Sequence, residues 1–419
     1  MLKTALMTGV FMAGLAQAAS AQTEISMWYH GAGNVVESRI NNQIVDDFNA
    51  SQSDWKVVLE SFPQLSYNDS VVAAALAGNL PCVLDVDGPN MPNWAWAGYM
   101  QPLPIDEAEF AEFLPGTKGV WDGKLYSIGL WDAAVALYAR KSTLEELGLR
   151  TPTLEQPWTA EEFMAALDAA KASGKFSYPL DLGMNDQGEW YPYAFSPFLQ
   201  SFGGDIVDRS TYQTAEGALN GDAAIEFGEW WQKLFADGYA PGTSEDPADQ
   251  QTGFIDGKFA FQWNGNWRAV ATMDAVDDVV FLPAPDFGEG NKIGGGSWQF
   301  GVSASCPNPD GAAAFIKFAT QDKYLAAFSD GIGLIPSTAS AAAMTKNYKE
   351  GGPLAVFYDL SKEQAVLRPV TPGYVVQAKV FIKALADIAN GANVGDTLDA
   401  AVDEIDADIK QNKGYGHTG

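Results

Sequence analysis

The chain has 419 residues, of which 47% are hydrophobic and 19% are charged. This composition is typical of a folded globular protein, it excludes an intrinsically disordered chain, and the length predicts two domains. The net charge of −28 repels polyanions, so we expect no nucleic-acid partner.

The N-terminus has the pattern of a secretory signal peptide. Lys3 precedes an apolar stretch from Ala5 to Leu15, and small residues follow up to Ala21. The apolar stretch is too short to cross a bilayer, which takes about 20 residues. We therefore expect cleavage near Ala21, with residues 1–21 removed and the mature protein in the periplasm.

Strand-like and helix-like segments alternate after the signal peptide. A β-prone stretch from Glu24 to His30 leads through the turn Gly31–Asn34 into a helical pattern with one apolar face. Further strands are predicted at Trp55–Phe62 and Cys82–Val86, with a helix at Asn68–Ala77 between them. This alternation predicts βαβ units with a parallel sheet, and hence the α/β class.

The second half of the chain contains further helices but no flexible linker. Thr159 and Glu162 fit a capping box, and apolar residues at helical spacing mark a last helix that includes Leu398. Because no tether separates two domains, we expect short strands to cross between them. The candidates are Val135–Tyr138 and Trp298–Val302.

Cysteine and histidine are scarce. Cys82 and Cys306 can form a disulfide in an exported chain, although they can equally stay separate thiols. The two histidines are His30 and His417, and the chain contains no C-x-x-C motif. We therefore expect no metal site and no cofactor.

The aromatic residues give the clearest functional signal. Many of the 13 tryptophans stand beside glycine, proline or short polar residues, where a ring more often lines a pocket than fills a core. A sugar presents C–H faces that pack on aromatic rings and hydroxyls that need polar partners. The pattern favours a carbohydrate site, with aromatic core packing as the alternative. The stretches are 26–31, 130–132, 189–192, 263–267, 294–298 and 369–374.

Several short segments, in one order, resemble the extracellular solute-binding proteins of ABC sugar importers, the maltose-binding-protein-like family. Each segment is loose on its own, but together they cover essentially the whole chain after the signal peptide. They are Trp28–Gly33, Pro81–Gly88, Leu125–Trp131, Val135–Leu149, Phe202–Gly204, Phe254–Phe261, Gly294–Trp298, Asn308–Ala313 and Gly333–Pro336.

The resemblance implies a two-lobed periplasmic-binding-protein fold of the type II kind, in which each lobe is a central sheet flanked by helices. It places lobe one at 23–134 plus 298–335 and lobe two at 138–294 plus 338–419. It further implies that the strand beginning at Cys82 pairs with the strand that ends near Cys306, and hence a disulfide between them. It describes a monomeric receptor, not an enzyme, that closes on a carbohydrate ligand and docks on the permease of an ABC importer.

Carried over by position, the resemblance also implies a ligand site between the lobes. The first lobe and the hinge would contribute Tyr29, His30, Gln64, Asp87, Trp131 and Asp132. The second lobe and the returning hinge strand would contribute Trp190, Gly203, Trp263, Asn264, Trp267, Gly295, Gly296, Trp298, Arg368 and Tyr374. We expect the rings of Trp131, Trp263 and Trp298 to meet across the cleft.

Two residues of this set have a second interpretation. Arg368 offers a fork of donors to adjacent hydroxyls or to an anion, but it can also form a surface ion pair. His30 can be a structural histidine. Together with the turn Gly31–Asn34, they leave an anionic sugar derivative open as the ligand.

Two enzyme classes are alternatives. Gly31 and Gly33, with Glu60 after the next strand, match part of a dinucleotide-binding fingerprint, although Val36 replaces its third glycine. A secreted glycoside-processing enzyme needs two carboxylates at a defined separation, and acidic residues such as Asp132 are available. Asp85 and Asp87 are two more. No catalytic motif supports either class.

Overall fold

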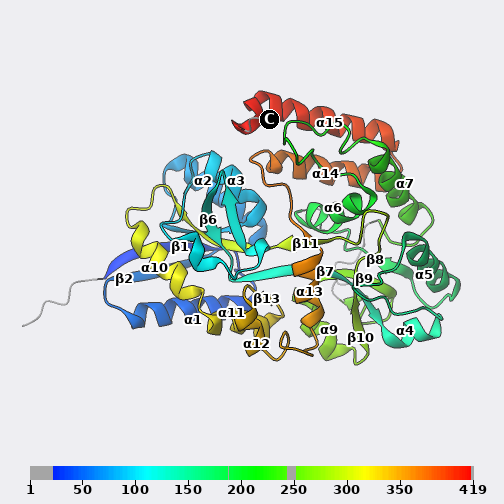
Figure 1. Cartoon of the computed structure of the whole chain (residues 1–419), viewed down its shortest axis with the longest axis horizontal. Coiled ribbons are helices and arrows are strands. Elements are labelled where there is room, and N and C mark those ends of the chain that lie inside the picture. Colours follow the sequence, from blue (N-terminus) through cyan, green and yellow to red (C-terminus); the bar gives the residue numbers. More distant parts are fainter. Residues whose placement is uncertain (1–21, 187, 243–251, 417–419) are drawn as a thin grey trace, which may run out of the picture.

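The computed structural model describes residues 22–186, 188–242 and 252–416. The predicted signal peptide and His417 lie outside these residues. Two groups of strands, each covered by helices, lie side by side and meet at the centre of the molecule (Figure 1). Within the described residues, no helix is both long enough and apolar enough to cross a membrane.

The first sheet has the strand order β2-β1-β3-β12-β6-β5, with β4 paired to β12. β1 is parallel to both β2 and β3, and β12 is antiparallel to β3 and β6. The strands are β1 (Thr23–Tyr29), β2 (Trp55–Ser61), β3 (Val83–Asp87), β4 (Met100–Gln101), β5 (Lys118–Trp121), β6 (Lys124–Ile128) and β12 (Trp298–Ser303).

The helices of the first sheet follow from its βαβ connections, as the sequence predicted. α1 (Val35–Ser51) begins where the Asn34 side chain accepts a hydrogen bond from Glu37 N, an N-cap that satisfies a helix amide. Its apolar stripe is buried. The other helices of this lobe are α2 (Gln64–Ala77), α3 (Met91–Trp96), α10 (Pro309–Ala319) and α11 (Asp322–Ile332). We call this sheet with its helices the first lobe.

The second sheet has the order β14-β11-β7-β9-β8, with β10 and β13 also paired to β7. The long strand β7 is buried along nearly its whole length, consistent with its central position. The strands are β7 (Trp131–Arg140), β8 (Tyr178–Asp181), β9 (Phe259–Gly265), β10 (Val279–Leu282), β11 (Ile293–Gly296), β13 (Ile335–Pro336) and β14 (Ala365–Val366). We call this sheet with its helices the second lobe.

Helices cover the second sheet, and the C-terminal pair reaches back toward the first lobe (Figure 1). The predicted capping box is present, because Thr159 and Glu162 exchange hydrogen bonds at the start of α5. The helices are α4 (Lys141–Glu146), α5 (Ala160–Ala172), α6 (Trp190–Phe202), α7 (Asp222–Ala236), α9 (Ala269–Ala275), α12 (Ala339–Met344), α13 (Ala355–Glu363), α14 (Tyr374–Ala389) and α15 (Val394–Gln411).

The described chain passes between the sheets at three places: from β6 to β7, from β11 to β12, and from α11 to β13. Short crossings were predicted, but neither candidate stretch is one of them. Trp298–Val302 belongs to β12 and pairs with β3 inside the first sheet, and Val135–Tyr138 likewise belongs to a single sheet. This second stretch lies inside the second sheet, where Tyr138 pairs with Gln262 of β9 and with Phe281 of β10. The two-lobed α/β fold is confirmed, while the expected residue limits of the lobes stay predictions.

The predicted disulfide joins Cys82 and Cys306, whose Cα atoms lie 4.4 Å apart. The pairing of β3 with β12 brings them together, because Val83 is opposite Val302 in an antiparallel register. The bridge therefore ties two segments 224 residues apart in sequence within the first lobe.

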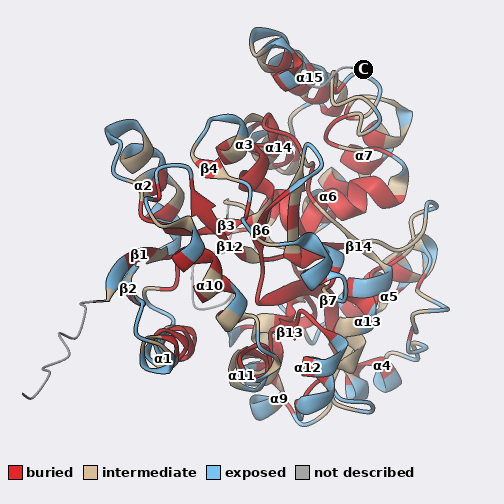
Figure 2. Ribbon diagram, turned by 60° about the vertical axis from the view of Figure 1, so that its left-hand side comes forward, coloured by how far each residue is buried: buried red, intermediate tan, exposed pale blue. Residues whose placement is uncertain are grey.

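Burial is concentrated in the two sheets and on the helix faces turned toward them (Figure 2). Large aromatic residues fill the core of the second lobe. Trp231 and Trp263 are among them, and both are almost completely buried. The first lobe has a smaller core around β1, β3 and α10. Each lobe thus has its own core, and the surface between the lobes is a separate environment.

Candidate functional site

The candidate site lies where the carboxyl ends of the first lobe's parallel strands face the second lobe. β3 ends at Asp87, and the 3₁₀ turn Gly88–Asn90 follows it directly. From the second lobe, the segment between β14 and α14 approaches this turn and carries Arg368. Ligands of α/β proteins bind outside the carboxyl ends of the strands, so the topology marks this place.

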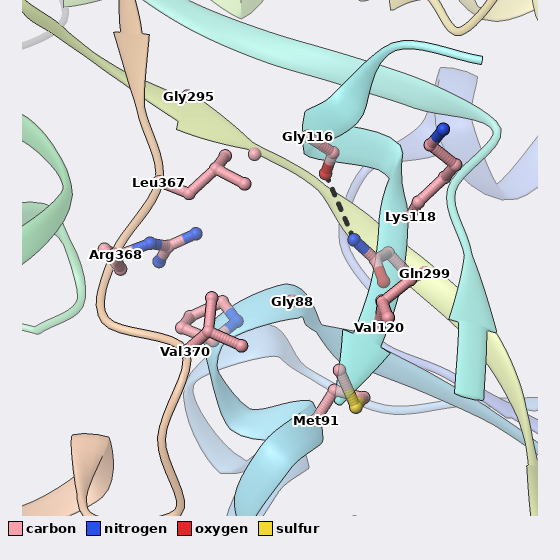
Figure 3. Close-up of a pocket in the computed structure, with 13 residues that line it drawn as sticks. Gly88, Met91, Gly116, Lys118, Val120, Gly295, Gln299, Leu367, Arg368 and Val370 are labelled. Atoms are coloured by element: carbon pink, nitrogen blue, oxygen red, sulfur yellow. Dashed lines mark hydrogen bonds between the residues drawn. The ribbon is translucent and has the colours of Figure 1, made fainter. Parts of the chain in front are cut away.

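A cavity of about 390 Å3, measured to its open mouth, lies between these segments. Arg368 and Leu367 reach in from the second lobe, and Gly88, Met91 and Gln299 face them from the first (Figure 3). Five glycines contribute to the lining: Gly88, Gly116, Gly119, Gly295 and Gly296.

Arg368 is the centre of an ion cluster that joins the two lobes. Its Nη1 and Nη2 donate to the two oxygens of Asp87 at 3.3 and 3.2 Å, and Nη1 also donates to Glu189 Oε1 at 2.6 Å. The Tyr374 hydroxyl donates to the same Glu189 oxygen. The guanidinium also lies over the ring of Tyr193, 5.1 Å from its centroid. The ion pair left open by the sequence is therefore present, but it is buried and not on the surface.

Burial determines the electrostatics of this cluster. It raises the pKa of Glu189 to about 7, because the charged carboxylate is penalised away from water and Asp87 adds repulsion, although Arg368 opposes both. Burial works against the charge of Arg368 too, but the carboxylates of Asp87 and Glu189 outweigh it and raise the pKa of Arg368. The guanidinium is charged, while Glu189 titrates near neutral pH.

Asp132 is a structural carboxylate at the crossing between the sheets. It accepts hydrogen bonds from Ala133 N at 2.9 Å, from Gly296 N at 3.0 Å and from Ser361 Oγ at 2.5 Å. A Cβ atom on Gly116 would lie 2.8 Å from Asp132 Oδ2, so only glycine fits there. Burial raises the pKa of Asp132. Its oxygens are occupied by the protein, which leaves it little capacity for a ligand.

His30 belongs to a second buried network, inside the first lobe. Its Nδ1 lies 2.5 Å from Asp85 Oδ2, its Nε2 lies 3.7 Å from Glu37, and the Tyr29 hydroxyl donates to Glu37. Burial lowers the pKa of His30, but the neighbouring carboxylates outweigh burial and leave it raised. The His30 ring stacks on Trp298 with 3.8 Å between centroids and an angle of 11°. The His30 ring therefore packs against one face of the Trp298 ring.

Aromatic rings of the second lobe form a cluster beside the ion cluster. Trp190, Tyr193 and Trp267 lie with centroids about 6 Å apart in each pair. The Trp190 indole donates to Leu182 O at 2.9 Å, which fixes its orientation. Trp190 and Trp267 are only partly buried, and Trp267 packs against apolar residues of both lobes. These rings supply the apolar half of the site.

A smaller cavity lies behind Trp298 in the first lobe. Its empty volume, with the open solvent at its mouth included, is about 200 Å3. Trp131 and Trp298 both line it, together with Tyr29 and Asp85. Trp131 is buried, and it lines this cavity together with Trp298 on the first-lobe side of the molecule.

Trp263 does not line the space between the lobes. It is 1% exposed, its ring packs on Phe198, and its indole donates to Ala194 O at 3.0 Å. β9 buries this face against α6, so the ring fills the second-lobe core. The expectation that Trp263 meets Trp131 and Trp298 across the cleft is wrong.

Three other predicted residues lie apart from the ion cluster. Gln64 is the exposed first residue of α2. Gly203 ends α6 in the left-handed conformation, φ +102°, about 20 Å along the helix from Glu189. The Asn264 side chain accepts from Gly265 N, a local turn bond. The segments from which these residues were predicted form local structure here, such as a helix start or a helix end, away from the ion cluster.

The sequence did not single out Glu189, Tyr193 or Gln299. Glu189 immediately precedes Trp190, inside a stretch that drew attention for its aromatics, and only the fold shows that it reaches Arg368. Gln299 follows Trp298 and donates to Gly116 O at 3.1 Å across the cavity wall (Figure 3). Among the described residues, no group of three or more histidine, cysteine or acidic side chains is arranged to hold a metal ion.

Comparison with known sequences identifies a family. The family described as "Bacterial extracellular solute-binding protein" matches this chain over residues 43–355. A binding protein of Brucella abortus (strain 2308) is 26% identical over 306 residues, covering 70% of each chain. The maltotriose-binding protein of Pyrococcus abyssi is 22% identical over 323 residues, 75% of this chain and 66% of that protein.

Solved structures show the same fold. The GacH receptor of Streptomyces glaucescens GLA.O, described unliganded and with acarbose, aligns with a TM-score of 0.77 at 21% identity, covering 94% of this chain and 100% of that one. The sugar-binding protein MalE of Xanthomonas citri aligns with a TM-score of 0.77 at 19% identity, covering 95% and 100%. A maltose/maltodextrin-binding domain of Bdellovibrio bacteriovorus bound to maltotriose reaches 0.73 at 20% identity, covering 93% and 100%.

Proposed function

Because this chain belongs to the bacterial extracellular solute-binding protein family, we propose that it is the carbohydrate receptor of an ABC importer. It captures a sugar in the cleft between its lobes and delivers it to the importer's membrane permease. Export to the periplasm after cleavage near Ala21 completes the proposal. This family consists of binding proteins, and we propose that the chain has no enzymatic activity.

The observation that carries the proposal is the pairing of two kinds of surface at one place. The partly exposed rings of Trp190 and Trp267 adjoin Tyr193, which lies under the guanidinium of Arg368, and Arg368 lines a cavity together with several glycines and Gln299. A sugar needs this combination, since its C–H faces pack on rings while its hydroxyls exchange hydrogen bonds with amides and carboxylates. The receptors that resemble this fold and bind maltotriose or acarbose support the ligand class.

The proposed ligand set differs from the one that the sequence suggested. It keeps Asp87, Trp190, Trp267, Gly295, Gly296, Arg368 and Tyr374, adds Glu189 and Gln299, and assigns His30 and Trp298 to the supporting wall. Both lobes contribute, so a bound sugar contacts both and favours the conformation in which they approach each other. Ligand-driven closure requires this difference in affinity between conformations.

A glycoside-processing enzyme is a poorer fit. Such an enzyme needs an acid and a second carboxylate free to act on the glycosidic bond. Here Asp132 accepts three hydrogen bonds from the protein, Asp85 is paired with His30, and Asp87 is paired with Arg368. These three carboxylates are engaged by the protein, and Glu189 by itself supplies one carboxylate where such an enzyme needs two.

A thermal-shift screen of the mature protein against neutral mono- and oligosaccharides, followed by calorimetry, tests the proposal. At least one sugar is expected to raise the melting temperature and to be recovered chemically unchanged. Trp267→Ala should abolish that shift. Trp55→Ala, at the amino end of β2 and far from the cleft, removes a similar ring from the first lobe and should leave it intact. A sugar hit that survives Trp267→Ala would place the site elsewhere, and hydrolysis would show an enzyme.

A further inference from the structure

The cavity between the lobes is bordered by positive charge. Among the described residues, the charged side chains that line it are the cations Arg368 and Lys118. Asp87 and Glu189 bond to Arg368, but neither belongs to the lining. A ligand group in this cavity therefore contacts cationic side chains before it contacts a carboxylate.

Arg368 has one unused edge. A guanidinium carries five N–H groups in one plane. Nη1 donates to Asp87 and to Glu189, while Nη2 donates once, to Asp87. The Nε–H and the second N–H of Nη2 are left. Because Asp87 takes the edge between Nη1 and Nη2, these two remaining donors lie side by side on the neighbouring edge.

This free edge of Arg368 is buried and borders the cavity. Arg368 is 7% exposed, and its Nε has no hydrogen-bond partner among the described residues. Gly296, which also lines the cavity, lies next to the edge, since a Cβ atom built on it would be 3.5 Å from Nη2. Buried donors are normally paired. Two parallel N–H donors fit both oxygens of a carboxylate or of a phosphate, so the edge is suited to an acidic group.

The third polar side chain of the lining, Gln299, is already paired. Its Nε2 donates to Gly116 O at 3.1 Å (Figure 3), and its Oε1 accepts from Ser127 Oγ at 2.6 Å. Among the described lining side chains, the polar groups left without a partner are therefore donors, on Arg368 and Lys118. An acidic group offers acceptors only, whereas a hydroxyl also brings an O–H that needs an acceptor. The lining thus matches an acidic group better than a hydroxyl.

Lys118, the first residue of β5, supplies the second cation. Its side chain is partly buried and forms no ion pair with a described residue. Figure 3 shows it across the cavity from Arg368, with its ammonium group turned away. A lysine has a flexible four-carbon stem. Because no partner holds it, the ammonium group can turn toward an anion bound at Arg368.

We propose that this cavity is a subsite for an acidic substituent, so that the receptor binds a sugar carrying a carboxylate or phosphate group more tightly than the neutral sugar of the same size. The inference rests on the proposed function, because the subsite lies in the same cleft. Two oxygens of the acidic group accept from Nε and Nη2 of Arg368, and Lys118 adds a further charge-assisted hydrogen bond.

Glu189 allows the site to take up a further negative charge. The groups that face it are Arg368 from the segment after β14, Asp87 from the end of β3 and Tyr374 from α14. Burial raises the pKa of Glu189 to about 7, so this carboxyl group gains a proton more easily than an exposed one. An anion bound at Arg368 favours the protonated form. Affinity for an acidic sugar should therefore be higher at pH 6 than at pH 8.

Calorimetry on the mature protein at pH 7 tests the proposal with matched probes. One set is glucose, glucuronate and glucose 6-phosphate, and a second is galactose, galacturonate and galactose 6-phosphate. Maltotriose and the galacturonate trimer extend the comparison to a longer ligand. We expect at least one acidic probe to bind about tenfold or more tightly than its neutral counterpart. The carboxylate and phosphate arms show which acidic group the subsite takes.

Three variants assign this preference to the cavity. Arg368→Lys keeps the charge but loses the pair of parallel donors, and the ratio of acidic to neutral affinity should fall about tenfold. Lys118→Gln should lower the same ratio about threefold. Lys124→Gln removes an exposed cation from β6 of the same lobe, outside the lining, and should leave the ratio unchanged. Melting curves confirm that each variant folds.

The outcomes separate the two proposals. Equal affinities for neutral and acidic sugars would overturn the acidic subsite and leave the receptor function standing. An unchanged ratio in Arg368→Lys would likewise overturn the subsite, because its free edge is then not used. If no sugar of either class binds at either length, the proposed receptor function fails, and the subsite fails with it.

Discussion

Two buried networks of ionisable side chains lie near the cleft, and they differ in what buries them. His30, Asp85 and Glu37 all belong to the first lobe and contact one another within it, with Trp131 of β7 lining the same small cavity as Asp85. Arg368 and Glu189 belong to the second lobe, but their partner Asp87 comes from the first. The first network therefore stays buried whatever the angle between the lobes, while the second is buried only where the lobes touch.

This difference gives the two networks different roles. One contributes to the stability of the fold, and the other to the balance between open and closed conformations. A charge enclosed within one lobe can gain water only if that lobe unfolds, so its pairing contributes to the stability of the fold. A charge enclosed between two lobes gains water when they separate, so its pairing contributes to the balance between conformations. The same chemistry serves as a structural element in one place and as a closure contact in the other.

Removing the cation of the first network should have the largest effect. His30→Ala leaves Asp85 and Glu37 buried without their partner, which should lower the free energy of unfolding by about 3–5 kcal/mol. Denaturant unfolding of the mature protein measures this. The exposed pair Arg150–Glu162 provides the control, because Arg150→Ala should cost at most about 1 kcal/mol. Equal losses in the two variants would show that the His30 network is not structural.

Removing the cation of the second network should lower the free energy of unfolding less than His30→Ala does, and it should weaken sugar binding. Arg368→Met leaves Asp87 and Glu189 unpaired, but the lobes can separate and let water reach them. We expect a loss of about 1–3 kcal/mol in unfolding free energy, a larger radius of gyration by X-ray scattering, and at least about tenfold weaker sugar binding. A loss as large as that of His30→Ala, with an unchanged radius of gyration, would contradict the contrast between the networks.

The pH dependence of the melting temperature tests the contribution of Glu189 in the second network. The pKa of Glu189 is raised in the folded protein from 4.5 to about 7 by burial, so the folded state holds this proton more tightly than the unfolded chain. The stabilising contribution is fully present below about pH 4.5 and is lost as the pH rises through 7. Melting temperatures should therefore fall between pH 5 and pH 7, and the fall should be smaller in Glu189→Gln. An identical slope in both proteins would rule out Glu189 as its source.

Much of the first lobe could be predicted from the sequence because its signals are local. The alternation of β-prone stretches and helical patterns up to Asp87 gave the parallel strands β1 to β3 in the right order. The helix after β2 begins earlier than predicted, at Gln64, because Pro63 can precede a helix start and the polar residues of its first turn hid the pattern. The disulfide followed from the family resemblance through the pairing of β3 with β12.

The site was harder to predict because side chains from distant segments create it. Trp263 and Trp267 stand in the same aromatic stretch, yet β9 turns the first into the core while the second follows the strand and reaches the surface between the lobes. Residue type and neighbours do not reveal this choice of face. Likewise Arg368, Asp87 and Glu189 are far apart in sequence, and only the crossing of the chain between the lobes makes them one cluster.

A further contact between the lobes, without charge, is expected to have the smallest effect. Trp96 of α3 and Tyr415 of the 3₁₀ turn Lys413–Gly416 meet edge to face with 5.0 Å between ring centroids. Beside them, the Asn93 amide donates to Pro372 O at 2.8 Å. Tyr415 is held in place by its hydroxyl, which donates to Asp408, and by a left-handed backbone conformation with φ +54°.

Because Trp96 is 43% exposed even in contact with Tyr415, this pair acts on the balance between conformations and adds little to the stability of either lobe. An aromatic pair of this kind contributes about 0.5–1.5 kcal/mol. Trp96→Ala should therefore weaken binding of the sugar found in the screen by about two- to tenfold, with a change in melting temperature of at most a few degrees. Leu76→Ala, at an exposed site on α2 of the same lobe, is the control and should leave affinity unchanged. If Trp96→Ala leaves affinity unchanged as well, the lobes are held together by the Arg368 cluster without help from the C-terminal turn, and the contrast between the two networks alone describes closure.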